Sequence, residues 1–147
     1  MRFESLPILF PLSPQLHGGE LRPIYAPPPH SVLRSQLKSK LHRALVTDAN
    51  VDYEGSISIP LDLMERADLW EGERVLVTSI TNGARLETYV IPGAAGSGQI
   101  VINGAAAHLI STGHRVTIMA FGLSDQPVTP HRLLLNGRNE VVSTSAK

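Results

Sequence analysis

The sequence of 147 residues contains no cysteine. That absence excludes disulfides, thiolate zinc sites and cysteine nucleophiles, and it fits a cytoplasmic protein. Six histidines are present, but no two of them stand at the spacing of a metal-binding motif. We therefore expect no metal site.

Charge of one sign is not in excess either, because 13 basic residues face 13 acidic ones. A dedicated nucleic-acid binder is usually more basic. No apolar run reaches the length of about 20 residues that spans a bilayer. The first residues, MRFESLPILFPLSP, hold only a short, proline-broken apolar stretch, which makes a poor secretory signal. We expect a soluble cytoplasmic protein that binds neither membrane nor nucleic acid.

Proline is unevenly spread, and seven of the 11 prolines precede residue 30. Residues 1–31 show no period of 2 or 3.6, so the sequence predicts a disordered leader there. Residues 32–147 are then one domain, long enough to bury a core. The leader could be a start-site artefact, with Val32 as the true first residue, or a real extension.

Beyond residue 32, short strands alternate with glycine-containing turns. In one strand, Lys38, Lys40 and His42 share a face opposite Leu37, Ser39 and Leu41. Asp48-Ala49-Asn50 reads as a turn, and Pro60 reads as the first-turn proline of an amphipathic helix over 61–69. Further strands are predicted at 51–59, 74–81, 84–91, 99–102 and 114–122, with a hairpin turn at Asn82-Gly83, a short helix within 103–110 and a last hairpin near Asn136-Gly137. This pattern favours a mainly β fold, a small barrel with short helices.

The predicted strand at 51–59 contains an unusual dipeptide, Gly55-Ser56, within YEGSISIP. Glycine inside a strand often marks a close approach of backbone or ligand. Ser56 lacks the nucleophile elbow of a Ser-His-Asp hydrolase. A competing interpretation takes the segment from Ser56 to Ile80 as a swapped-hairpin module of a DNA-binding regulator, with Ser56 as a surface hydroxyl.

Four motifs occur in order along the chain: KLHRALVT, YEGS, NGARLETY and INGAAAH. In this combination the chain resembles the aspartate 1-decarboxylases, pyruvoyl-dependent enzymes that make β-alanine for pantothenate synthesis. The resemblance runs from Val32 to about Gly122 and fades after Ser124. It implies a double-psi β-barrel assembled as a homotetramer with active sites between subunits.

The resemblance also implies what Gly55-Ser56 does. The chain would cut itself between these residues into pieces 1–55 and 56–147, which makes the tetramer a heterooctamer of cleaved chains. Ser56 would become a pyruvoyl group that forms a Schiff base with L-aspartate, so neither pyridoxal phosphate nor metal is needed. A maturation helper protein is a possible further partner.

The resemblance assigns roles to residues at the matching positions. Tyr89 would be the proton donor, and Thr88 would donate to the oxyanion formed during cleavage. Since adjacent residues of a regular strand face opposite sides, this pair requires the strand to end, twist or bulge there, or the site to lie between subunits. The remaining predicted substrate-binding residues are Arg85, Lys40, Gly104, Ala105 and Ala106, and the supporting residues are Asn103, Tyr53 and His42.

Overall fold

The computed structural model describes residues 32–144 of the chain. The predicted leader, residues 1–31, lies outside them. The mainly β class is confirmed, whereas the double-psi connection stays a prediction. The strands are β1 (Arg34–Leu45), β2 (Asp48–Asn50), β3 (Ser56–Pro60), β4 (Arg74–Ser79), β5 (Arg85–Gly93), β6 (Val101–Asn103), β7 (Arg115–Ser124), β8 (His131–Leu135) and β9 (Val141–Thr144), with the helix α1 (Leu61–Ala67) and the 3-10 helix η1 (Gly104–His108) between them.

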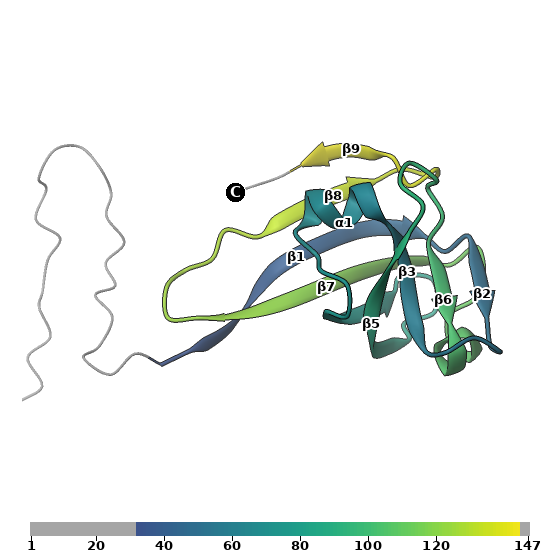
Figure 1. Ribbon diagram of the computed structural model, residues 1–147, viewed down its shortest axis with the longest axis horizontal. Coiled ribbons are helices and arrows are strands. Elements are labelled where there is room, and N and C mark those ends of the chain that lie inside the picture. Colours follow the sequence, from purple (N-terminus) through teal and green to yellow (C-terminus); the bar gives the residue numbers. More distant parts are fainter. Residues whose placement is uncertain (1–31, 145–147) are drawn as a thin grey trace, which may run out of the picture. The chain divides into compact units, whose positions relative to one another are not determined.

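The nine strands are hydrogen-bonded in the order β2-β6-β3-β5-β4-β7-β1-β8-β9. Long antiparallel β1 and β7 lie side by side in one part of Figure 1, and β2, β6, β3 and β5 lie together in another. Strand β5 joins the two parts, because residues 85–89 pair with β4 and residues 90–93 pair with β3. The predicted site residues of β5 therefore lie where its pairing partner changes.

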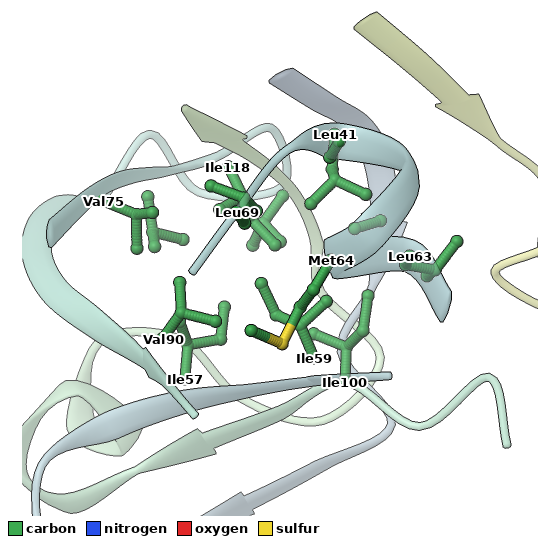
Figure 2. Close-up of a cluster of buried hydrophobic side chains, with 14 of the residues drawn as sticks. Leu41, Ile57, Ile59, Leu63, Met64, Leu69, Val75, Val90, Ile100 and Ile118 are labelled. Carbon is green, nitrogen blue, oxygen red and sulfur yellow. The ribbon is translucent and has the colours of Figure 1, made fainter. Parts of the chain in front are cut away.

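The core lies where side chains from both parts of the sheet meet under α1. Its largest members are fully buried aliphatic residues, as Figure 2 shows for one cluster. They include Leu41, Ile57, Ile59, Val75, Val90, Ile100 and Ile118. Burying side chains of this size contributes roughly 1.5–3 kcal/mol each. Ile57 and Ile59 of β3 are buried in this core, and β3 begins at Ser56.

Helix α1 is shorter than predicted. Leu63, Met64 and Ala67 face the core, whereas Leu61, the first residue of the helix, is 43% exposed. Pro60 precedes the helix as its cap instead of occupying the first turn. Asp68 ends the helix in the left-handed region at φ 53, a conformation that Asp tolerates better than most residues. Neither helix in residues 32–144 is long and apolar enough to cross a membrane.

The alternation predicted for β1 is confirmed over residues 39–42, whereas Leu37 and Lys38 are both partly buried and the register with β7 shifts between Leu37 and Ser39. Ser39 and Leu41 are buried, whereas Lys40 and His42 are only partly so. The register with β7 shifts between Leu41 and Ala44, and Arg43 there has φ 63. Such a bulge bends a strand and redirects the side chains that flank it.

Two predictions around residue 50 are wrong. Residues 48–50 form β2, which pairs in parallel with β6, and the predicted strand over 51–59 begins only at Ser56. The Asn50 side-chain oxygen accepts a hydrogen bond from the Asp52 amide at 3.0 Å. This local turn satisfies a backbone donor outside the sheet and competes with strand formation. The Gly55-Ser56 dipeptide thus stands at the junction of a loop and a buried strand.

Candidate functional site

The Ser56 hydroxyl is buried, and it is hydrogen-bonded to one residue that precedes it in the sequence and to one that follows it. The side chain of Asn103 donates from Nδ2 to Ser56 Oγ at 2.9 Å, and Ser56 Oγ donates to the Glu54 carbonyl at 3.4 Å. The residues of the first pair are also antiparallel partners across β3 and β6. Ser56 is 1% exposed and Asn103 is 5% exposed. The competing interpretation of Ser56 as a surface hydroxyl is therefore wrong.

The backbone of Gly104 lies against Gly55, the residue that precedes Ser56. A Cβ at position 104 would lie 2.8 Å from the Gly55 Cα and 2.9 Å from its nitrogen, and Gly104 has φ +69. Both features require glycine. At Gly55 itself a Cβ would meet nothing, and its φ is not in the left-handed region. The steric requirement for glycine in this contact therefore lies at Gly104.

Thr88 and Tyr89 lie on β5, next to β3. The parallel register pairs Ile57 with Val90, so Ser56 and Tyr89 each directly precede a paired residue. Strand β5 neither ends at Thr88 nor shows a register shift there. Tyr89 is 40% exposed. Four arrangements were predicted to let Thr88 and Tyr89 reach one site. Two of them, an end of the strand and a bulge at these residues, are wrong. The other two, a twist of the strand where its pairing partner changes and a site between subunits, stay predictions.

The predicted backbone donors are in η1, which starts directly after Asn103. Its bonds run from the Leu109 and Ile110 amides to the Ala106 carbonyl, and Ala105 is exposed. The amides that open such a helix have no partner within it. The Tyr53 carbonyl would lie 3.1 Å from a Cβ at Gly104, so residue 53 borders the same place through its backbone.

Arg85 is the first residue of β5, directly after the turn of the β4–β5 hairpin, and the prediction of this hairpin is confirmed. Arg85 is exposed, and it forms no ion pair with any residue in 32–144. Asn82 in the hairpin donates from Nδ2 to the Leu109 carbonyl at 2.9 Å. The hairpin that carries Arg85 is thereby tied to the end of η1. Sequence reasoning missed this role of Asn82, whose only signal was its place in an Asn-Gly turn.

Lys40 and His42 do not lie among the residues around Ser56. They line a separate groove together with Arg132, Leu133, Leu134 and Ser143 of β8 and β9. His42 Nδ1 lies 3.0 Å from Thr117 Oγ1. Burial lowers the pKa of His42 below its ordinary value of 6.5, and the positive charges of Lys40 and Arg43 lower it further. Sequence reasoning missed Thr117 and Arg132, because neither lies within a quoted motif.

The described residues thus form two groups, one around the buried serine and one along the basic groove. The fold and the first group define a class: a mainly β protein in which a largely buried strand begins at a buried serine that directly follows an exposed glycine. Such a junction can support nucleophilic chemistry on its own backbone, because the hydroxyl and the peptide carbonyl belong to adjacent residues.

A sequence model of one family, aspartate decarboxylase, matches residues 32–142. A protein named aspartate 1-decarboxylase from Thermotoga sp. (strain RQ2) is 52% identical over 111 residues, which are 76% of this chain and 97% of that protein. A second, from Corynebacterium efficiens, is 61% identical over 90 residues, which are 61% of this chain and 66% of that protein.

The chain belongs to the aspartate decarboxylase family. As a member it is an enzyme, a carbon–carbon lyase. The match covers both parts of the sheet and every residue of the two groups except Ser143, and it confirms the resemblance seen in the four motifs. A DNA-binding regulator, which accounted only for residues around 56–80, finds no support in it.

Proposed function

We propose that the chain is a self-processing, pyruvoyl-dependent decarboxylase that converts L-aspartate to β-alanine and CO₂ for pantothenate synthesis. One observation carries the proposal: Ser56 Oγ is buried, bonded to Asn103 at 2.9 Å, and directly follows a glycine against which Gly104 is packed. A buried structural serine would also need a hydrogen-bond partner, but it would not need a backbone packed this closely against the residue before it. A cytoplasmic location stays a prediction.

The first reaction is cleavage of the chain. Ser56 Oγ attacks the carbonyl carbon of Gly55 and loses its proton; the bond to the Ser56 nitrogen then breaks, which leaves an ester and a free amine. Elimination removes the Cα proton of residue 56, breaks the Cβ–Oγ bond and releases Gly55 as a carboxylate, which leaves a dehydroalanine. Its enamine takes up a proton at Cβ and becomes an imine, and water then replaces the nitrogen, which leaves as ammonia and gives a ketone at residue 56. No outside oxidant is required, because elimination and hydrolysis are redox-neutral.

The residues around Ser56 suit this attack. The Glu54 carbonyl and the Asn103 amide orient Oγ, and the amide N–H stabilises charge that develops on oxygen. Removing one such donor to a developing oxyanion typically costs about 10²–10³ in rate. Thr88 on the neighbouring strand is the proposed donor to the oxyanion formed at the Gly55 carbonyl. Gly104 keeps the backbone beside Gly55 free of side-chain atoms.

Once formed, the pyruvoyl group supplies an electron sink for decarboxylation, a property that no ordinary side chain has. Arg85 and Lys40 are the proposed cations for the two substrate carboxylates, since guanidinium and ammonium groups bind such anions strongly. Tyr89 is the proposed donor of the proton that replaces CO₂. The opening amides of η1, at Gly104, Ala105 and Ala106, border the substrate.

Assembly into a homotetramer would bring the two groups of residues together. Lys40 and His42 line a groove that contains none of the residues around Ser56. A site built between subunits resolves this, because one copy can supply the groove and the next copy the serine. The cleaved tetramer would hold eight chains. A maturation helper stays a prediction.

Replacement of the nucleophile tests the proposal. We expect Ser56→Ala to remain one uncut chain, to react with no carbonyl-trapping hydrazine and to release no CO₂ from L-aspartate. Ser58→Ala, two residues along the same strand, is the matched control and should cut itself as the parent does. Intact mass after denaturation measures cleavage. A parent chain that stays uncut and unlabelled under all incubations would contradict the proposal.

A further inference from the structure

The groove between β1, β8 and β9 concentrates positive charge. Lys40 and Arg132 are direct partners in the parallel register of β1 and β8, so their side chains leave the same face of the sheet. His42 lies two residues along β1 and lines the same groove. No aspartate or glutamate is among the groove residues. Like charges placed directly opposite each other across two strands destabilise a sheet.

Neither cation is neutralised within residues 32–144. The four ion pairs there involve Lys38, Arg74 and Arg138 but neither Lys40 nor Arg132. The Nε of Arg132 is buried and has no hydrogen-bond partner among the described residues. A buried donor without a partner is costly, and more so when it belongs to a charged group. An anion in the groove would relieve both the repulsion and the unmet donor.

The hollow on the other side of Arg132 does not supply that anion. Its lining includes Arg66 and His131, with Thr129 and Thr144, and again no acidic residue. Arg132 thus lines two hollows that lack acidic side chains, and neither offers its guanidinium a carboxylate.

We propose that Arg132 binds a substrate carboxylate together with Lys40, which makes it a further substrate-binding residue of this enzyme. The inference rests on the proposed function for the identity of the ligand. A guanidinium presents a planar fork that matches a carboxylate, and the neighbouring ammonium adds a point charge. The Ser143 hydroxyl offers one more donor, and the partly exposed Leu134, on the same face of β8 as Arg132, provides apolar surface for a short carbon chain.

A dicarboxylate that lacks the amino group, succinate, tests binding apart from catalysis. In the uncut Ser56→Ala protein, we expect succinate to shift the ring resonances of His42 and inorganic phosphate to do so more weakly. Arg132→Gln should abolish the succinate shift. Arg138→Gln is the matched control, since Arg138 is exposed and paired with Glu140, and should leave it unchanged. An equal response to phosphate, or a shift that survives Arg132→Gln, would overturn the inference.

Kinetics provide the second readout. Loss of a charged hydrogen bond corresponds to a rise of about 10- to 100-fold in KM for L-aspartate. We expect this rise for Arg132→Gln with little change in kcat, and a smaller rise for Arg132→Lys, which keeps the charge but loses the fork. An unchanged KM in a fully cleaved Arg132→Gln enzyme would contradict the assignment. A parent chain that never cleaves itself would contradict the proposed function instead, and the succinate titration would still decide the role of Arg132.

Discussion

Asn103 and Gly104 are neighbours in the sequence, and each contacts one member of the same dipeptide. The side chain of Asn103 bonds to Ser56, whereas the backbone of Gly104 lies against Gly55. Two adjacent residues therefore control both the nucleophile and the peptide bond that it attacks. This explains in physical terms why an asparagine must be followed by a residue without a side chain.

Gly104→Ala should impair self-cleavage more than it impairs folding. The new Cβ would need to displace Gly55, whose Cα would lie at 2.8 Å, and a non-glycine residue at this φ also carries strain of about 1–3 kcal/mol. Gly113→Ala is the matched control, because Gly113 has φ +87 but open space around a Cβ. We expect both variants to lose stability in urea unfolding, Gly104→Ala more than Gly113→Ala, but slow cleavage only in Gly104→Ala. Equal cleavage rates in the two variants would contradict this.

The pKa of His42 makes stability depend on pH. Burial and the charges of Lys40 and Arg43 lower this pKa in the folded chain below its ordinary value of 6.5. As the pH falls through 6.5, the unfolded chain therefore binds a proton more readily than the folded chain does. The free energy of unfolding should decrease in this range and level off, for this residue, below the folded-state pKa.

Urea unfolding measured at a series of pH values checks this prediction. His42→Gln should have a flatter dependence just below the ordinary pKa of 6.5, whereas His108→Gln, at an exposed position, should follow the parent. A parent-like slope in His42→Gln would show that other groups cause the dependence.

At the scale of elements, β5 connects the two parts of the sheet, and the β4–β5 hairpin carries Arg85. Residues 85–89 belong with β4, and residues 90–93 belong with β3. The hairpin is fastened to η1 by Asn82, whose Oδ1 also accepts from the Ala84 amide at 3.1 Å. The Asn82 side chain thus stabilises the turn of the hairpin and also holds this turn next to η1.

Asn82→Ala should loosen this attachment. Loss of the bond to the Leu109 carbonyl and the bond from the Ala84 amide is expected to lower the free energy of unfolding by about 1–2 kcal/mol. Because Arg85 follows the turn, KM for L-aspartate should rise while cleavage at Ser56 proceeds. Cleavage yield, urea unfolding and steady-state kinetics together check this. Normal kinetics combined with lowered stability would limit Asn82 to a structural role.

At the scale of the whole molecule, exposed apolar residues support assembly. Leu123 is 69% exposed on β7, and Leu33, which precedes β1, is 59% exposed. Leu123 pairs in register with Ser35, so the two leucines lie near the same end of these strands. Exposed apolar patches on a small protein often mark an interface.

Leu123→Lys should weaken the proposed tetramer, because a charge buried in an interface is costly. Native mass spectrometry measures the assembly, and decarboxylation should fall with it if Lys40 serves a neighbouring copy. Val142→Lys is the control at another exposed strand position, on β9. A monomeric parent that remains active would contradict both the assembly and the shared site.

The sequence by itself determined the mainly β class, most strand positions, the hairpin at Asn82-Gly83 and the family, because alternation, turn residues and ordered motifs are local signals. It also singled out Gly55-Ser56. Only the tertiary structure decided that Ser56 is buried against Asn103, that the need for glycine lies at Gly104, and that Arg132 stands beside Lys40. These facts depend on which strands pair, and strand pairing joins residues that are far apart in the chain. The turn at 48–50 was mispredicted for the same reason, since its pairing with β6 overrode local preference.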